Sequence, residues 1–536
     1  MPTMRDRGAP TLVLPRPTSA STSYEYTSVP TVPDTSTPSP SKEAFLLPPS
    51  ATGPVSPDSA PPSPWRTTFT PQHALAPAGS PHPFLRLRRS LVLVAGALVT
   101  ASLLLLAPPA AHLSAYLPAQ LRGAHATGCS AEAWSAGRWV PKDPPLTPNA
   151  TAVDVFAASG FEGCTQDWFK PHWFLHTKEA DWHNMDQYRW NAAQWRWKSD
   201  SEVCEADVRR SKAEELLQEL VGKGGWILLG DSLSEQHFFS LGCVLFPHVY
   251  AVWGSGWWEQ HMYIRADSPL LETLDLPPGF DASTTPIISN LRTDHGFTKE
   301  ELIDIYESTP QSATVPTSQL FTDYPVQSFP IDDYLSRFFN ATYNYHALIF
   351  SAAAHFTPRE FAFPGGQPAI APFYEAVVQN WTDVALEYLA EDASDREIIV
   401  RGASSGHDKC HEHMEPFVDE WPRAESYNWA EIPKYNDVFQ VGRLTFVDLI
   451  LGCSGNVCVA LTNDLQAMIE KANHPRLSFL SLERPSQLRP DATDGVFAPA
   501  PQHSEDCLHF AVGTGIFEGW TDYLAYFLRS RWRDRP

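Results

Sequence analysis

The sequence predicts an α/β protein in which a parallel sheet flanked by helices follows a disordered tail and one transmembrane helix. Three observations support this prediction. The first is an apolar run, 226–229, which ends in Gly-Asp-Ser and is followed by a helical pattern over 235–245. This order is typical of a buried parallel strand that delivers a residue at its carboxyl end. The second is a series of further apolar runs between helical segments, and the third is a charge-free apolar stretch near residue 100.

Residues 1–85 form the predicted disordered tail. They hold 19 of the 49 prolines of the 536-residue chain, together with many serines and threonines. A segment of this composition buries too little apolar surface to offset the entropy lost on ordering. We therefore expect no packed structure before residue 86.

A transmembrane helix is predicted within residues 86–112. The stretch 90–107 contains no charged residue, and its length reaches the lower limit for spanning a bilayer. A signal peptide is the alternative, but this stretch begins too far from the N-terminus for one. Arginines at 86, 88 and 89 flank it on the N-terminal side, which predicts a cytosolic tail and a type II, single-pass orientation. Residues 113–128 would then form a stem and 129–536 a lumenal domain.

The cysteines and glycosylation sequons agree with this orientation. All eight cysteines and three sequons, at Asn149, Asn340 and Asn380, follow the predicted span. An even number of cysteines is typical of a disulfide framework in an oxidising compartment. Reduced cysteines or a zinc site are weaker interpretations, because only Cys453 and Cys458 are closely spaced. We therefore expect glycan on one or more of the three asparagines.

The charge distribution limits the classes of partner. Residues 1–89 carry eight Lys or Arg and five Asp or Glu, a net charge of +3, whereas the remainder carries 31 and 57, a net charge of −26. An acidic lumenal domain argues against nucleic acid and anionic lipid head groups as binding partners. The sequence therefore predicts no nucleic-acid partner.

Further elements of the sheet are predicted downstream of the first strand. Apolar runs at 345–351, 397–400 and 443–452 are each short enough to be buried strands. An amphipathic pattern over 516–532 predicts a C-terminal helix. Strands that alternate with helices in this way indicate a parallel sheet with helices on both faces.

Ser232 is the predicted nucleophile. It lies where a helix N-terminus leaves backbone N–H groups free and favours negative charge, as a nucleophilic serine and its oxyanion require. Gly-Asp-Ser alone is a weak signal, because ordinary strand-to-helix turns share it. A second pattern, Asp506-x-x-His509, lies near the C-terminus, and its spacing lets both side chains lie on one side of a single turn. Asp506 would then fix the tautomer of His509, whose other ring nitrogen accepts the serine proton.

These motifs resemble those of the SGNH (GDSL-like) hydrolase and acyltransferase superfamily. More specifically, the chain resembles the trichome-birefringence-like polysaccharide O-acetyltransferases of plants, whose catalytic part is also called a PC-esterase domain. That family opens with a Cys-Gly-x-Trp-Val block, continues with a Trp-Arg-Trp block ending in Cys and with Gly-Asp-Ser, and closes with Asp-Cys-x-His. This chain has the matching blocks at 129–140, 186–204, 230–232 and 506–509, in the same order. The resemblance covers about Cys129 to the C-terminus.

The resemblance implies further site residues and a set of disulfides. Contacts to the oxyanion or substrate are expected from Gly230, Asp231, Ala353, His355, Ser405 and His407. Faces that stack on sugar rings are expected from Trp139, Trp195 and Trp197, although most tryptophans in 129–204 are expected to be core residues. The expected disulfides are Cys129–Cys204 and Cys164–Cys243, with Cys410–Cys507 and Cys453–Cys458 as the preferred pairing of the other four.

Two features depart from the family pattern. Glu235 stands where the family has Arg, and a negative charge there would harm an oxyanion unless the side chain points away. Ala353 and Ala354 stand where a glycine would allow close backbone approach. These departures indicate a divergent, fungal-type branch. The cluster 407–413 also contains metal-ligating residue types, but its spacing is irregular and Cys410 is needed for a disulfide, so no metal ligand is assigned.

The resemblance implies transfer of acetyl groups to hydroxyls of a polysaccharide or glycan in the Golgi lumen, through an acetyl-serine intermediate. No bound cofactor is expected. An acetyl donor of unknown identity would act as co-substrate, and a polysaccharide or glycan as acceptor. Two alternatives stay open. A carbohydrate acetylesterase would use the same three residues with water as acceptor, and a non-catalytic glycan-binding or wall-organising protein would use none of them.

Overall fold

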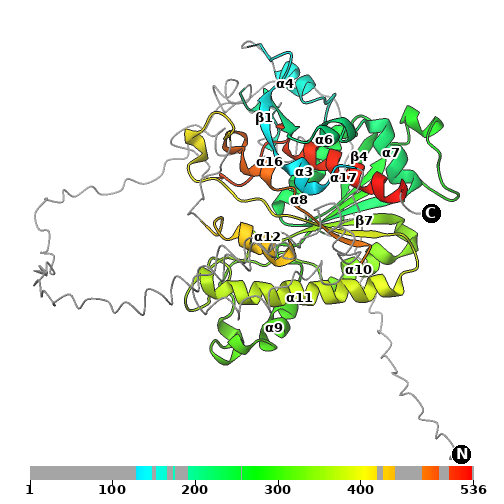
Figure 1. Cartoon of the computed structure of the whole chain (residues 1–536). Coiled ribbons are helices and arrows are strands. Elements are labelled where there is room, and N and C mark those ends of the chain that lie inside the picture. Colours follow the sequence, from blue (N-terminus) through cyan, green and yellow to red (C-terminus); the bar gives the residue numbers. More distant parts are fainter. Residues whose placement is uncertain are drawn as a thin grey trace, which may run out of the picture. The chain divides into compact units, whose positions relative to one another are not determined.

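A seven-stranded mixed β-sheet forms the centre of the described structure, and helices cover both of its faces (Figure 1). The structure is a computed structural model that describes residues 128–147, 152–165, 173–175, 191–254, 256, 258–418, 427–440, 474–493 and 506–533. The predicted tail and transmembrane helix lie outside these residues, as do the stem up to residue 127, Asn149, Cys453, Cys458 and the predicted strand at 443–452. Within the described helices, none is both long enough and apolar enough to cross a membrane.

The sheet has the strand order β4-β5-β6-β3-β7-β8-β9. The strands from β6 to β9 run parallel, whereas β4 and β5 form an antiparallel hairpin at one edge. The expectation of a wholly parallel sheet is therefore wrong at this edge, because residues 254–258 are too few for the crossover that parallel neighbours need. The strands span Gly225–Gly230 (β3), Val249–Trp253 (β4), Glu259–Ile264 (β5), Ile288–Arg292 (β6), Tyr345–Ser351 (β7), Glu397–Arg401 (β8) and Leu477–Leu480 (β9).

Strand β3 is the predicted first strand, and its position explains its continuous apolar sequence. It lies between β6 and β7, so both of its edges are paired. Trp226 and Leu228 join the apolar core on one face of the sheet, and Ile227 and Leu229 join the core on the other. A strand buried on both faces has no polar positions to alternate with apolar ones.

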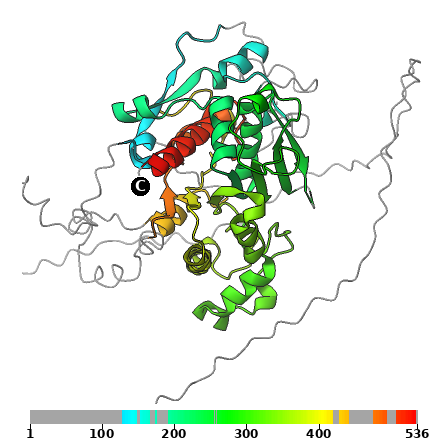
Figure 2. The ribbon, with the colours of Figure 1, turned by 90° about the vertical axis from the view of Figure 1, so that its right-hand side faces the viewer.

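The helices form two layers on opposite faces of the sheet. Helices α7, α8 and α17 contribute to one core, and α9, α10 and α11 to the other. Figure 2 shows α11 almost end-on, on the opposite side of the sheet from α17. The bounds of these helices are Ala213–Gly222 (α7), Ser232–Val244 (α8), Lys299–Glu307 (α9), Ile331–Phe339 (α10), Gln367–Glu391 (α11) and Ile516–Arg533 (α17). The sequence pattern over 235–245 thus corresponds to α8, which begins three residues earlier than predicted.

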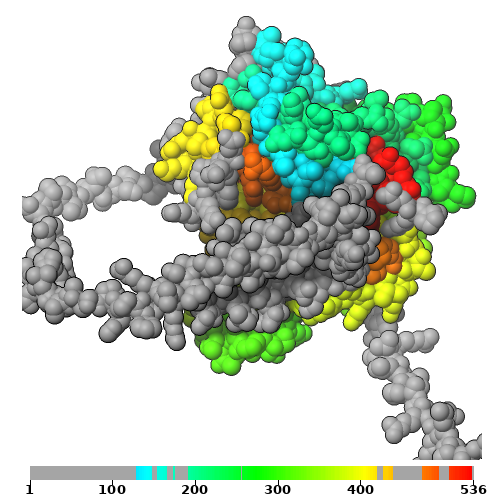
Figure 3. Space-filling view, in the orientation of Figure 1, coloured from blue at the N-terminus to red at the C-terminus, as the bar shows by residue number. Residues whose placement is uncertain are grey.

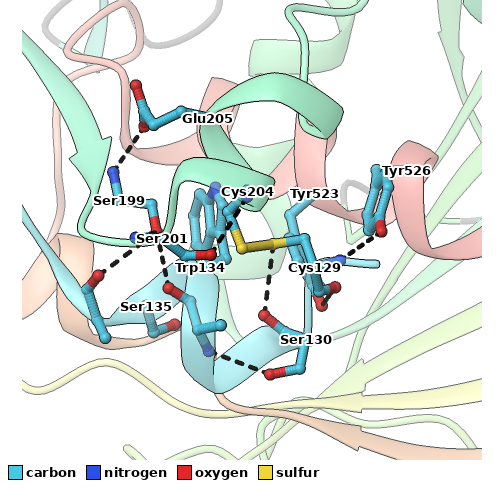
Figure 4. Close-up of a disulfide and its surroundings, with 12 residues drawn as sticks. Cys129, Ser130, Trp134, Ser135, Ser199, Ser201, Cys204, Glu205, Tyr523 and Tyr526 are labelled. Carbon is cyan, nitrogen blue, oxygen red and sulfur yellow. Dashed lines mark hydrogen bonds between the residues drawn. A yellow bond between two sulfur atoms is a disulfide. The ribbon is translucent and has the colours of Figure 1, made fainter. Parts of the chain in front are cut away.

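The described part of residues 129–204, which we call the tryptophan-rich region, has its own small sheet. Strands β1 (Gly137–Pro141) and β2 (Trp195–Ser199) pair antiparallel, with Trp139 opposite Trp197. The bond Cys129–Cys204 closes the region (Figure 4). The N–H of Cys129 donates to the hydroxyl of Tyr526 in α17 at 2.6 Å, which attaches the region to the main domain. Its short helices are α3 (Ala131–Ser135), α4 (Ala152–Ala158) and α6 (Glu202–Asp207).

Contacts beyond α17 also hold the tryptophan-rich region. The hydroxyl of Ser135 donates to the carbonyl oxygen of Ser481, and the indole N–H of Trp139 donates to that of Pro485 in α16 (Arg484–Gln487). In the space-filling view, the N-terminal residues (cyan) accordingly lie against the segment that contains α16 (orange) (Figure 3). Helix α12 (Ile432–Gln440) lies on the other side of the sheet and packs on α11.

Three disulfides are present among the described cysteines. They are Cys129–Cys204, Cys164–Cys243 and Cys410–Cys507, the pairs that the resemblance implied and the preferred pairing included. The second joins the tryptophan-rich region to α8. The third ties the loop after β8 to the residue two positions before His509.

Candidate active site

Ser232, His509 and Asp506 lie in hydrogen-bonding contact at the carboxyl edge of the sheet. Ser232 is the first residue of α8 and follows β3 by one turn residue. Its hydroxyl oxygen lies 2.5 Å from Nε2 of His509, and Nδ1 of His509 lies 2.7 Å from Oδ2 of Asp506. With the ring neutral, Nδ1–H donates to Asp506 and Nε2 accepts the hydroxyl proton of Ser232. A serine held in this way can be deprotonated as it attacks.

The turn between β3 and α8 depends on a glycine and an aspartate. A Cβ at Gly230 would lie 2.2 Å from the carbonyl oxygen of Ser351 in β7, so only glycine lets the two strands come this close. Asp231 is the N-cap of α8, and its side chain accepts the N–H of Leu233 at 3.0 Å. This geometry leaves the N–H of Ser232 at the helix N-terminus, where the dipole favours an anion.

Asp506 and His509 are held together by an aspartate turn rather than by a turn of helix. Oδ1 of Asp506 accepts the N–H groups of Leu508 at 3.3 Å and of His509 at 3.1 Å. An aspartate that binds local N–H groups in this way favours a turn over a helix, so the predicted proximity is present with a different backbone. Burial alone would raise the pKa of Asp506, but attraction to His509 and these hydrogen bonds outweigh it and hold the pKa well below its usual value.

Two residues that the sequence did not single out fix His509. Trp173 is 4 % exposed and stacks on the imidazole ring, with ring centroids 5.1 Å apart. Its carbonyl oxygen accepts the N–H of Val512 at 2.7 Å, which anchors it beside the ring. Gln236, in the first turns of α8, hydrogen-bonds to both backbone groups of Phe510. Trp173 is one of many tryptophans and Gln236 is an ordinary helix former, so neither had a signal in the sequence.

Glu235 is paired with a cation, Arg292, which it shares with Asp294. The side chain is fully buried, with Oε2 at 3.4 Å from Nη1 of Arg292 and Oε1 accepting from Nε2 of Gln260 at 2.8 Å. Arg292 is the last residue of β6 and lies opposite Gly230 in the β3–β6 register. The carboxylate therefore has a cation beside it, next to the turn that carries Ser232, and its negative charge does not act alone on that turn.

His355 lies in the loop after β7, the parallel neighbour of β3. Its Nδ1 is 2.5 Å from Oε1 of Glu360, and its Nε2 is 3.5 Å from Oδ1 of Asp294. Burial alone would lower the pKa of His355, but the two carboxylates outweigh it and raise the pKa to about 9, so the ring is cationic at neutral pH. No hydrogen bond joins it to Ser232 among the described residues. Ala353 is buried, and its carbonyl oxygen accepts from Asn428 at 3.2 Å.

Ser405 and His407 are engaged with the backbone in the loop after β8. The hydroxyl of Ser405 donates to the carbonyl oxygen of Trp429 at 3.1 Å, and Nε2 of His407 lies 2.8 Å from that of Gln487. Burial lowers the pKa of His407 to about 4, so this ring is neutral. These contacts fit structural roles better than the expected substrate contacts. Within the described residues there is also no group of three side chains placed to hold a metal ion.

The burial of Trp139 does not favour the expected stacking on a sugar ring. Trp139 is 6 % exposed, and the guanidinium of Arg489 lies 4.4 Å from the centroid of its ring. Little of the ring surface is therefore accessible to a sugar. Trp195 and Trp197 are partly buried and pack against the apolar core that contains Trp139. The indole N–H of Trp197 donates to the carbonyl oxygen of Trp134 at 3.0 Å.

An exposed tryptophan that was not predicted lies at the same sheet edge as Ser232. Trp258 is 37 % exposed and immediately precedes β5. Its carbonyl oxygen accepts the N–H of Arg292 at 2.9 Å, which places it at the carboxyl end of β6. Strand β5, which Trp258 precedes, is two strands from β3, which leads to Ser232. Strand spacing therefore places these two strands about 10 Å apart.

Comparisons with known proteins leave the resemblance as a prediction. No protein-family model, no curated protein and no solved structure matches the chain.

Proposed function

We propose that the protein is an SGNH-type O-acetyltransferase, akin to the trichome-birefringence-like family, that acetylates hydroxyls of a polysaccharide or glycan. The observation that carries the proposal is the hydrogen-bonded series Ser232–His509–Asp506 at the carboxyl end of a buried parallel strand. The order of motifs along the chain supports the acetyl group as the cargo, and the predicted type II anchor supports the Golgi lumen as the place.

In the first half-reaction, the hydroxyl oxygen of Ser232 attacks the carbonyl carbon of the acetyl donor while Nε2 of His509 takes the hydroxyl proton. The N–H of Ser232, at the N-terminus of α8, would stabilise the oxyanion. The leaving group of the donor then departs with the proton from His509, which leaves acetyl-Ser232. Asp506 stabilises the imidazolium that forms in between.

In the second half-reaction, a sugar hydroxyl attacks the acetyl-serine, and His509 takes the proton of that hydroxyl. Collapse of the intermediate releases the acetylated sugar and returns the proton to Ser232. If water took the place of the sugar, the same residues would form an acetylesterase, so the two functions differ in how well the site excludes water. A non-catalytic glycan-binding role would not require three aligned side chains at these distances.

The test is to incubate the full chain with a labelled acetyl donor and a panel of glycans, and to score transfer against release. Ser232→Ala should lower the rate roughly a thousandfold or more without unfolding the protein. Ser234→Ala, in the same turn of α8, is the matched control and should stay close to wild type. Near-normal turnover by folded Ser232→Ala would defeat the proposal, and release without transfer would favour the esterase.

The proposed localisation has a separate test. Protease added to sealed microsomes should remove the N-terminal tail and spare the rest of the protein. Asn340 and Asn380 are exposed, as glycan attachment requires, and at least one of the three sequons should carry glycan. Digestion of the domain that follows residue 128 would show that the orientation is wrong.

A further inference from the structure

Three polar side chains on one face of α8 contact the segment that carries His509. Ser232, Gln236 and Ser240 are spaced by four residues, so they follow one another along a single helix face. Ser232 contacts the ring of His509, Gln236 the backbone of the next residue, and Ser240 the carboxylate of Glu518 at 2.7 Å. Helix α8 therefore contacts residues 506–518, which we call the His509 segment, at three successive points along one face.

The middle contact uses both ends of a side-chain amide. Nε2 of Gln236 donates to the carbonyl oxygen of Phe510 at 2.7 Å, and Oε1 accepts the N–H of Phe510 at 3.2 Å. Gln236 has no exposed surface, so the loss of either bond would leave a buried backbone group unsatisfied. Two bonds also fix the rotation of the Phe510 backbone relative to α8, which one bond would not.

We infer that Gln236 is a positioning residue that holds His509 within hydrogen-bonding distance of Ser232. Ser232 and Gln236 lie about one turn apart on the same helix, and their partners, His509 and Phe510, are adjacent in sequence. The distance between the reacting serine and histidine therefore depends directly on the Gln236–Phe510 contact. Proton transfer needs hydrogen-bond reach, and a 1 Å misplacement can lower a rate by about a hundredfold. The inference rests on the proposed function of Ser232.

Other contacts hold the His509 segment, but they do so from other parts of the fold. The aspartate turn at Asp506 is local, the disulfide ties Cys507 to the loop after β8, and Trp173 covers the imidazole ring. Glu518 accepts the N–H groups of Gly513 and Gly515, which shapes the far end of the segment. Gln236 differs because it comes from the helix that carries the nucleophile and binds next to the base.

The test measures how fast an alkyl fluorophosphonate labels Ser232 in the full chain. The serine oxygen attacks phosphorus, an oxygen–phosphorus bond forms, fluoride leaves and His509 takes the proton. The rate therefore reports the alignment of Ser232 with His509, and it needs neither the natural donor nor the acceptor. Wild type should be labelled, and Ser232→Ala should not be labelled.

Two variants separate positioning from stability. Gln236→Leu removes both hydrogen bonds and should slow labelling by about ten- to a hundredfold. Gln236→Glu keeps both bonds while it is protonated, because the acid O–H donates to the Phe510 carbonyl. Its carboxylate cannot donate and repels that carbonyl, so the rate relative to wild type should fall by about tenfold or more as pH rises. Burial raises the pH at which this ionisation occurs.

Gln311→Glu is the matched control. Nε2 of Gln311 donates to the carbonyl oxygen of Ala369 at 2.9 Å, so ionisation of a glutamate at this position would break one hydrogen bond far from α8 in the sequence. It should follow the wild-type labelling rate at every pH. Circular dichroism at each pH gives the folded fraction, so that the rate can be expressed per folded molecule.

If both Gln236 variants are folded and are labelled at the wild-type rate at all pH values, the inference is overturned and Ser232 remains the nucleophile. A loss that followed only the folded fraction would overturn it as well. If Gln236→Leu does not fold, the pH profile of Gln236→Glu decides. A wild-type protein that is not labelled, or is labelled equally after Ser232→Ala, would overturn the proposed function instead.

Discussion

The His509 segment and the tryptophan-rich region are held in place by different kinds of contact. The His509 segment is fixed by directed hydrogen bonds, such as those of Asp506, Gln236 and Glu518. The tryptophan-rich region also has hydrogen bonds to the main domain, but it adds ring packing, as between Trp134 and Tyr523 of α17, whose centroids lie 5.2 Å apart. Directed bonds define distances to fractions of an ångström, whereas apolar burial supplies stability with little direction. The first kind suits a reacting site and the second a supporting scaffold.

The largest difference between the regions should come from the same substitution made once in each. Asp506→Asn keeps an oxygen for the local N–H groups but removes the charge and allows the wrong tautomer of His509. We expect the rate to fall about a thousand- to ten-thousandfold. Asp200→Asn, in the tryptophan-rich region, breaks an exposed 2.7 Å ion pair with Arg138 and should change the rate less than twofold. Acetyl transfer and fluorophosphonate labelling both measure the rate of each variant. A similar loss of rate in the two variants would contradict the proposed difference between the two regions.

The disulfides provide a second comparison, of stability against activity. Cys410–Cys507 closes 97 residues and Cys129–Cys204 closes 75, so loss of either bond should cost about 4–5 kcal/mol in the chain-entropy model. Replacing Cys410 and Cys507 by alanine should also slow labelling per folded molecule, because that bond tethers the His509 segment.

Replacing Cys129 and Cys204 should lower stability and yield alone. The pair Cys453 and Cys458, which lies outside the described residues, should matter less than either. Peptide mapping under non-reducing conditions gives the pairing, and Cys507 joined to any cysteine other than Cys410 would contradict this account.

Two tryptophans test whether burial separates scaffold from site. Trp139→Ala removes a buried ring and should cost about 3–5 kcal/mol of unfolding free energy, with the KM for glycan unchanged in the folded protein. Trp258→Ala should cost less stability than Trp139→Ala, because Trp258 is 37 % exposed and buries less apolar surface. If Trp258 contacts the acceptor, its loss should raise the KM for glycan by about three- to tenfold and leave the KM for the acetyl donor unchanged. Denaturant unfolding and steady-state kinetics give both numbers, and the reverse pattern would be inconsistent with the proposed division.

The smallest expected effect is a pH dependence of stability from His355. Its folded-state pKa of about 9 lies above its ordinary value of 6.5, so its stabilisation is complete below about pH 6.5 and is lost as pH rises to about 9. We expect the free energy of unfolding to fall by about 1–3 kcal/mol over this window. His355→Gln should flatten the decline, whereas Trp139→Ala should lower stability without changing its slope. If the free energy of unfolding of His355→Gln declined equally with pH, groups other than His355 would be its cause.

The sequence by itself determined the elements whose signals are local. The apolar runs at β3, β7 and β8 and the amphipathic pattern of α17 predicted these elements to within a few residues. The antiparallel β4 and β5, and also β6, β9 and α11, were not predicted. Strands β5 and β6 mix polar and apolar residues without a clear period, whereas β4 is an apolar run that was a local signal but was not assigned. The turn residues Gly230, Asp231 and Ser232 were also readable, since glycine, an N-cap and a helix start have strong local preferences.

Three of the disulfides and the Ser–His–Asp group were predicted across long separations, but only through the resemblance and the chemistry that these residue types require of one another. Glutamine and tryptophan carry no such requirement. Gln236 and Phe510 are 274 residues apart, and Glu235 and Arg292 are 57 apart, so nothing in their spacing indicates contact. The tertiary structure alone decided these partners, the stacking of Trp173 on His509, and which of Trp139 and Trp258 is buried. Hydrogen bonds and ring contacts act over a few ångströms, and which residues come that close is set by how the strands and crossover helices order the whole chain in space.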